Sequence, residues 1–232
     1  MNRTSLQLLS LLLAASVSAH AQARDASLVD TLARAAPKLD RKVLELAARA
    51  LRCAAPSAAP PSTLSVIDYS RPSTEPRLWV FDLARQRLLF EEWVAHGRNT
   101  GGNLATSFSN EAGSYKSSLG AFLTAESYVG GNGYSLRLQG LEPGINDKAR
   151  ERAIVIHGAP YVSEQLIRAQ GRLGRSLGCP AVRASVARPL IDTISGGSFL
   201  FAYYPDPAWL RRSQLLDADC GQGVASVGAA GR

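Results

Sequence analysis

Short apolar segments separated by polar turns dominate the chain from residue 63 to residue 212 and predict a mainly β domain. Seven segments share the length and the β-branched or aromatic content of strands: 64–68, 78–82, 87–95, 120–125, 135–139, 153–156 and 199–204. The second and third are expected to pair as a hairpin. Residues 97–118, rich in Gly, Asn and Ser, are expected to form a long loop, which in a compact domain is usually functional or mobile.

Apolar residues at helical spacing occur mainly before this region. Val43, Leu44, Ala47 and Leu51 recur on one face of a helical stretch over 28–52. Two helices are expected there, because Pro37 interrupts the pattern and Asp40 can cap the second helix, and short helices are expected at 163–170, capped by Ser163, and at 186–194.

The amino terminus predicts export. One positive residue, a brief apolar run and small residues before Ala21 or Ala23 are typical of a secretory signal peptide, which favours a periplasmic or secreted protein. A membrane anchor retained after export is the alternative, but no later stretch is apolar and long enough to span a membrane. The expected order is signal peptide 1–21, N-terminal helical segment 22–53, Pro-rich connector 54–62, catalytic domain 63–212 and flexible tail 213–232.

Composition and charge narrow the class of protein. Hydrophobic residues make up 46% of the chain and charged residues 19%, which is enough for a packed core. The formal net charge is +7, but the basic residues are scattered and no basic run contains interleaved aromatic residues, so nucleic acid is not an expected partner. The positive net charge is explained equally well by binding to anionic surfaces or acidic substrates and by a need for solubility.

Three cysteines leave one unpaired if two of them form a disulfide outside the cytoplasm. We expect Cys53 and Cys220 to link the two ends of the chain and Cys179 to stay reduced; an intermolecular bond is the alternative. A cysteine-based zinc site is disfavoured, because no two cysteines lie close in sequence and only His96 and His157 remain outside the predicted signal peptide. His96 is expected to be structural or exposed.

The candidate chemistry lies around His157-Gly158 and Cys179. A thiol nucleophile needs a base, and an imidazole held at the end of a buried strand can supply it. The N–H groups of Gly178 and Cys179 are the nearest candidate donors to an oxyanion, because Pro180 has no N–H. Two alternatives stay open at this point: a cysteine beside a proline is often an inert core residue, and a lone histidine is usually structural.

The motif resembles a known family. His157-Gly158 followed by Gly-Arg-Ser-Leu-Gly-Cys-Pro-Ala over 174–181 is similar to the signature of L,D-transpeptidase catalytic domains, the YkuD-type fold. The likeness covers about residues 62–210 and includes weaker matches at 117–122 and 134–142.

The resemblance implies a β-sandwich-like domain that acts on peptidoglycan stem peptides without a metal or organic cofactor. Cys179 would attack a peptide carbonyl at a diaminopimelate residue, His157 would be the base, and the Gly158 carbonyl would orient its ring. The thioester would pass to an amine or to water. The sequence departs from the commonest pattern at Leu177, where a second His is usual, at Pro180-Ala181, and in the 21-residue gap between His157 and Cys179.

Arginines near the motif are candidates for binding the carboxylates of stem peptides. Arg172, Arg175 and Arg183 are read this way, Arg183 as a replacement for an Arg that usually follows the Cys, although intramolecular or solvated pairs explain each of them as well. Ser176 is assigned to the substrate site together with Arg175 and Arg183, and it is expected either to hydrogen-bond near the thiol or to shape the turn.

We expect a monomer, and three other functions stay open. The first is a murein L,D-endopeptidase, carboxypeptidase or amidase. The second is a general cysteine peptidase acting on proteins, and the third is a non-catalytic domain that binds the cell wall.

Overall fold

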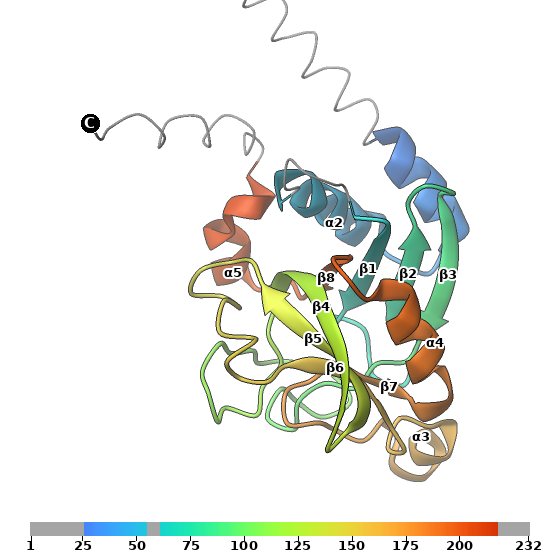
Figure 1. The fold of residues 1–232 in the computed structure, drawn as a ribbon, viewed down its shortest axis with the longest axis vertical. Helices are drawn as coiled ribbons and strands as arrows, with labels where there is room; N and C mark the ends of the chain where they lie inside the picture. Colours follow the sequence, from blue (N-terminus) through green and yellow to red (C-terminus); the bar gives the residue numbers. More distant parts are fainter. Residues whose placement is uncertain (1–25, 55–60, 218–232) are drawn as a thin grey trace, which may run out of the picture.

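The computed structural model describes residues 26–54 and 61–217. Its elements follow the chain in the order α2 (Arg41–Ala54), β1 (Thr63–Asp68), β2 (Leu78–Asp82), β3 (Arg87–Glu92), β4 (Gly120–Gly130), β5 (Gly133–Gly140), β6 (Val155–Ala159), α3 (Glu164–Gln170), β7 (Ala181–Arg183), α4 (Ala184–Ile194), β8 (Phe199–Tyr203), α5 (Pro207–Arg212) and η1 (Gln214–Leu216) (Figure 1). A further helical stretch over 26–35 precedes α2. The mainly β class with a few short helices is confirmed.

The eight strands form one mixed sheet that nearly closes on itself. Its order is β3-β2-β1-β8-β4-β5-β6-β7, with parallel pairs β1–β8 and β6–β7 and antiparallel pairs elsewhere. An antiparallel bridge joins Ala95, which follows β3, to Ala181 in β7. This contact brings the two outer strands of the sheet together. Fewer backbone N–H and C=O groups at the edges of the sheet therefore remain unpaired within residues 61–217.

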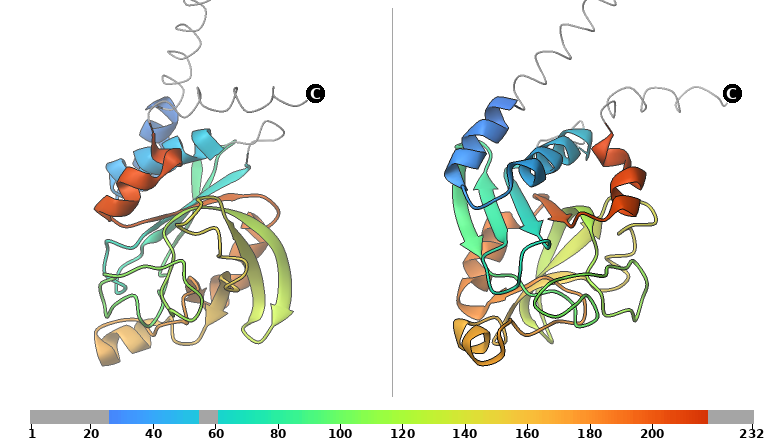
Figure 2. Two further views of the ribbon diagram at one scale, coloured as in Figure 1. Left: turned by 90° about the vertical axis from the view of Figure 1, so that its left-hand side faces the viewer. Right: turned by 180° about the vertical axis from the view of Figure 1, so that it is seen from behind.

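The N-terminal helices share the core of the sheet. Asp40 caps α2 as expected, its Oδ1 accepting the Lys42 N–H at 2.7 Å. The buried face of α2 consists of small and aliphatic side chains, namely Val43, Leu44, Ala47, Ala48 and Ala50. These residues belong to the same apolar cluster as the buried strands β1, β2 and β8. Figure 2 shows α2 and α5 at one end of the molecule and α3 at the opposite end.

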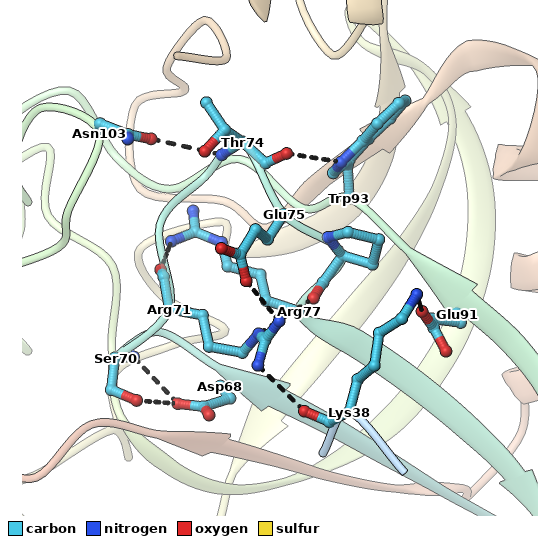
Figure 3. Close-up of polar contacts among 11 residues, drawn as sticks. Lys38, Asp68, Ser70, Arg71, Thr74, Glu75, Arg77, Glu91, Trp93 and Asn103 are labelled. Atoms are coloured by element: carbon cyan, nitrogen blue, oxygen red, sulfur yellow. Dashed lines mark hydrogen bonds and ion pairs between the residues drawn. The ribbon is translucent and has the colours of Figure 1, made fainter. Parts of the chain in front are cut away.

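Polar contacts attach the same helices to the sheet. Arg71, in the loop between β1 and β2, donates from Nη1 to the Lys38 carbonyl at 3.0 Å and from Nε to the Pro76 carbonyl at 3.2 Å, and it pairs with Glu75 (Figure 3). Lys38 Nζ lies 2.9 Å from Glu91 of β3. The helical segment is therefore part of one folding unit with the sheet, although a Pro-rich stretch separates the two in sequence.

Residues 97–118 form the expected long loop, which is internally hydrogen-bonded. The Thr100 carbonyl accepts the N–H groups of Thr106 (2.7 Å) and Ser107 (3.0 Å), and Thr100 Oγ1 accepts the Ser117 N–H at 2.8 Å. Thr100 and Ser117 are both buried, so the two ends of this loop lie against the body of the domain.

The predicted signal peptide and Cys220 lie outside the described residues. The sulfur of Cys53 lies 4.0 Å from the carbonyl oxygen of Asp217, close to the end of the described chain, and its pairing with Cys220 stays a prediction. The expectation of a loose tail from residue 213 is wrong at its start, because Leu216 is buried and its carbonyl accepts Arg49 Nη1 at 3.2 Å. Over 26–54 and 61–217, no helix has the length and apolar character needed to span a membrane.

Candidate active site

His157 lies in the middle of β6, between two neighbouring strands. It faces Ser135 of β5 and Ala181 of β7 in the register of the sheet. Its side chain is buried, and its Nδ1 lies 3.0 Å from the carbonyl oxygen of Gly158. A carbonyl can only accept, so this contact assigns the proton of the neutral ring to Nδ1 and leaves Nε2 free to accept another. This is the arrangement that a general base requires.

Gly158 is also required by packing. A Cβ at this position would lie 2.8 Å from the Cβ of Ala187 and 3.1 Å from the Cα of Ala184. Both residues belong to α4, which therefore lies directly against the strand that carries His157. Any larger residue would push α4 away or displace the carbonyl that orients the imidazole.

Ser176 shapes the turn that leads to the nucleophile. Its Oγ accepts the Gly178 N–H at 3.1 Å and donates to the Cys179 carbonyl at 2.6 Å. Its backbone pairs with the segment after β3, its N–H donating to the His96 carbonyl at 2.9 Å and its carbonyl accepting the Arg98 N–H at 2.8 Å. These hydrogen bonds are those expected of a residue that shapes the turn.

Gly178 is fixed by its backbone angle and by a close contact. Its φ is +127°, a region that favours glycine. A Cβ at Gly178 would lie 2.9 Å from the carbonyl oxygen of Lys116 in the long loop. The loop is thus packed against the turn just before Cys179, and Ser117 Oγ adds a hydrogen bond to the Gly178 carbonyl at 3.0 Å.

Cys179 is a free and almost fully buried thiol, with 9% of its surface exposed. It lies two residues before Ala181, which faces His157 across the β6–β7 pair. Its sulfur accepts the Val155 N–H at 3.4 Å and donates to the Ala153 carbonyl at 3.6 Å. Cys179 itself precedes β7, and its sulfur lies against the backbone of the segment that leads into β6, the strand that carries His157. Within residues 61–217, the thiol bonds to Val155 and Ala153 and not to the imidazole.

Burial disfavours the charged forms of both groups. It raises the pKa of the Cys179 thiol, an effect opposed first by the Val155 N–H and then by the positive charge of Arg152. It lowers the pKa of His157, an effect opposed by the bond to the Gly158 carbonyl. At rest the thiol and the imidazole are therefore both neutral. A thiolate forms favourably only when the imidazole takes up its proton.

The possible donors to an oxyanion are fewer than the sequence suggested. The Gly178 N–H, one of the two expected donors, is bonded to Ser176 Oγ instead. Pro180 has no N–H. The Cys179 N–H has no acceptor within the part of the chain that the structure describes, and it is the backbone donor that remains beside the thiol.

Two of the predicted substrate-binding arginines bind other parts of the protein. Arg183 makes a bidentate ion pair with Glu92 of β3, with N–O distances of 2.9 and 2.6 Å. Arg175 donates from Nη1 to the carbonyls of Arg98 (3.1 Å) and Gly101 (3.0 Å) and so holds the start of the long loop. Both side chains thus have partners within the protein, and their assignment to stem-peptide carboxylates stays a prediction.

Three neighbours of the thiol were missed in the sequence. Arg152 is not singled out by the sequence, because nothing in the pattern marks it as different from Arg150. Ala153 adopts a positive φ of 53°, and its carbonyl accepts the thiol of Cys179. A positive φ is rare for alanine, so the sequence does not predict this conformation. Tyr161 places its ring 6.5 Å from the His157 ring in an edge-on contact.

No group of three or more His, Cys, Asp or Glu residues suited to a metal ion occurs in residues 26–54 and 61–217. Leu177, which stands where the family usually has a second His, is 60% exposed beside the nucleophile. The turn before Cys179 thus carries an apolar side chain, Leu177, that is accessible to solvent.

Comparisons with solved structures give similar chains at low identity. An L,D-transpeptidase from Mycobacterium smegmatis is 13% identical, with a TM-score of 0.40 and coverage of 62% of this chain and 59% of that chain. An L,D-transpeptidase from Stackebrandtia nassauensis is 14% identical, with a TM-score of 0.38 and 77% of each chain covered. The helical cell shape determining protein Pgp2 from Campylobacter jejuni is 14% identical, with a TM-score of 0.42 and coverage of 62% and 48%. This chain thus covers less than two thirds of the first and the last of them.

No curated protein matches the chain. The sequence model of the L,D-transpeptidase catalytic domain matches residues 35–203, a span that begins before α2 and ends with β8. Because this match covers well over half of the 232 residues, the chain belongs to the L,D-transpeptidase catalytic domain family.

Proposed function

We propose that the protein is a cysteine-dependent acyl transferase that acts on the stem peptides of peptidoglycan. Its nucleophile would be Cys179 and its general base His157. One observation carries the proposal: the free thiol of Cys179 lies two residues before Ala181, the register partner of His157, whose Nδ1 lies 3.0 Å from the Gly158 carbonyl. Membership of the family provides the substrate class.

The reaction begins with proton transfer from the thiol to Nε2 of His157, which requires the sulfur to turn from the Ala153 carbonyl toward the ring. The thiolate attacks the carbonyl carbon of the donor peptide, and the Cys179 N–H donates to the oxygen that gains charge. The C–N bond then breaks, the imidazolium gives its proton to the departing amine, and a thioester remains on Cys179. An acceptor amine or water attacks the thioester, loses a proton to His157 and regenerates the thiol.

The acceptor decides the outcome of the second step. An amine gives a cross-link and makes the protein a transferase, whereas water trims the stem peptide and makes it an endopeptidase or carboxypeptidase. An amidase reaction follows the same scheme with a different scissile bond. Both need the thiol, so the loss of Cys179 must abolish either activity.

Export to the periplasm or beyond is part of the proposal, because peptidoglycan lies outside the cytoplasmic membrane. The predicted signal peptide supports it. The net positive charge of the chain suits a polymer that carries carboxylates.

The test is incubation of the purified protein with muropeptides, followed by mass spectrometry of the products. The wild type should give either a product heavier by an acceptor peptide or one lighter by a released residue. Cys179→Ser, which keeps the shape but not the thiol, should give neither, and His157→Gln should slow the reaction by about 10²–10⁴-fold. The matched control is Ser195→Ala at the exposed end of α4, which should match the wild type.

A non-catalytic domain that binds the cell wall is the alternative that this experiment rejects or supports. If the wild type binds muropeptides without changing their masses, the proposed chemistry is wrong. Equal turnover by the wild type and Cys179→Ser would be just as damaging, because it would place the activity elsewhere.

A further inference from the structure

Arg152 lies three residues before β6, the strand that carries His157, and it bonds to four residues of the long loop. Its Nη1 donates to the Ser109 carbonyl at 2.6 Å and to Ser118 Oγ at 2.5 Å. Its Nη2 donates to the Lys116 carbonyl at 2.7 Å and to Ser114 Oγ at 3.2 Å. One half-buried guanidinium therefore organises ten successive residues of the loop.

The same contacts reach the turn of the nucleophile. The Lys116 carbonyl that Arg152 holds is the one packed against Gly178, where a Cβ would lie only 2.9 Å from it. Ser117, the next residue, bonds to the Gly178 carbonyl at 3.0 Å. On the other side, Ala153 follows Arg152 directly, and its carbonyl accepts the thiol of Cys179 at 3.6 Å. Arg152 is thus connected to Cys179 by two routes, one through Lys116 and Gly178 and one through Ala153.

The charge of Arg152 is not neutralised by a carboxylate within residues 26–54 and 61–217. Its neighbour Arg150 pairs with Glu126 at 2.7 Å, and Arg183 pairs with Glu92 at 2.6 Å, whereas the four partners of Arg152 are carbonyl and hydroxyl oxygens. Burial lowers the pKa of Arg152 and the field of the Cys179 thiolate raises it, which means that the two charges stabilise each other. An unpaired cation in a partly buried site acts more strongly than one in open solvent.

We propose that Arg152 is a positioning residue of the active site, which holds the 109–118 loop against the turn of the nucleophile and supplies the positive charge that favours the thiolate of Cys179. It takes the place that we had assigned to Arg183. The inference rests on the proposed function, because a positive charge beside Cys179 assists catalysis only if the thiolate is the attacking group.

The experiment measures how the alkylation rate of Cys179 by iodoacetamide depends on pH, with the labelled peptide identified by mass. Arg152→Gln keeps part of the hydrogen bonding and removes the charge. It should raise the midpoint of the profile by about one pH unit and slow alkylation at neutral pH about 10-fold. Arg152→Lys keeps the charge and should hold the midpoint within about 0.3 units of the wild type. Arg150→Gln is the matched control, two residues away, exposed and paired with Glu126, and should leave the profile unchanged.

The outcomes separate this inference from the proposed function. If His157→Gln has the same profile as the wild type, the proposed base is wrong, whatever Arg152 does. If His157→Gln changes the profile but Arg152→Gln does not, the role of Arg152 is overturned and the proposed function stands. Equal shifts in the Gln and Lys variants would also overturn it, because a purely structural role does not depend on charge. Circular dichroism shows whether each variant is folded. If Arg152→Gln is unfolded, the Lys variant decides: a rise of one full pH unit in the midpoint of its alkylation profile would overturn the inference.

Discussion

His96, unlike His157, is a buried histidine whose ring contacts only other parts of the fold. Its ring is 1% exposed, its Nδ1 lies 2.8 Å from Nη2 of the buried Arg77, and its Nε2 lies 3.4 Å from the Gly101 carbonyl. A guanidinium only donates, so Nδ1 must accept and the ring must be neutral. Burial first, and then the charge of Arg77, lower the pKa of His96 to about 4.

This lowered pKa predicts a loss of stability in acid. Above pH 6.5 neither the folded nor the unfolded His96 binds a proton, so its contribution is fully present. As the pH falls toward the folded pKa of about 4, the unfolded chain binds a proton that the folded chain does not. The free energy of unfolding should therefore fall by about 3 kcal/mol over this range on account of His96.

His96→Gln offers the comparison, because its amide oxygen can still accept from Arg77 but does not titrate. Urea denaturation at pH 7 and pH 4.5 should show a smaller loss for the variant than for the wild type, by about 2–3 kcal/mol. Both proteins carry the same carboxylates and the same His157, so these cancel in the difference. Equal losses in the two proteins would mean that His96 is already charged in the fold.

The residues of the site divide according to what a sequence can reveal. The candidate nucleophile and base could be named because a glycine precedes Cys179, a buried strand runs into His157, and the two motifs resemble those of a known family. Arg152 could not be named, because its contacts lie in a loop more than thirty residues away in sequence. Ala153 could not be named, because its role depends on a positive φ and on a contact with Cys179, 26 residues away. The partner of Arg183 could not be named for the same reason: Glu92 lies 91 residues away along the chain.

At the scale of elements, the strands with the clearest apolar pattern were predicted best. β2 has the predicted bounds, Leu78–Asp82, and is buried along its whole length. β6 extends through His157 to Ala159, beyond the predicted end at residue 156, because β7 pairs alongside it. β7 itself has only three residues and follows a proline, so its strand character comes from its partner and not from its own sequence.

The N-terminal helices carry a prediction of their own. Leu44 of α2 is fully buried in the cluster that also contains Leu64 and Phe201 of the sheet. Leu44→Ala should lower the free energy of unfolding by about 3 kcal/mol, since a buried Leu loses both its transfer free energy and its packing. Chemical denaturation of the whole protein measures the loss.

Lys42→Ala is the matched control, because Lys42 is exposed on the same helix. It should change stability by no more than about 0.5 kcal/mol. If Leu44→Ala behaved like this control, α2 would be an appendage, and the catalytic domain would begin at β1 as the sequence suggested. A single transition with a large loss for Leu44→Ala places the helices in one cooperative unit with the site.

At the scale of the molecule, the site depends on how the sheet closes. Ala95 and Ala181 join the segment after β3 to β7, and the Ala95 N–H donates to the Ala181 carbonyl at 2.8 Å. Arg183 and Glu92 reinforce the same junction with a bidentate ion pair, and the guanidinium of Arg183 also lies 5.5 Å from the ring of Trp93. Cys179 lies just before this junction in the chain, so closure of the sheet fixes the position of the thiol relative to His157.

A double-mutant cycle on Arg183 and Glu92 tests whether the pair serves closure or substrate binding. Glu92 is 8% exposed and Arg183 39% exposed on their side chains, so solvent screens the pair only in part, and a coupling free energy of about 1–2 kcal/mol is expected from urea denaturation. Arg183→Gln should lower stability and leave the KM for muropeptides unchanged. The control is Arg168→Gln, whose pair with Glu164 on α3 is exposed on both sides and should contribute less than about 0.5 kcal/mol. An increase in KM for Arg183→Gln at unchanged stability would return Arg183 to the substrate site, and it would mean that the ion pair opens when the stem peptide binds.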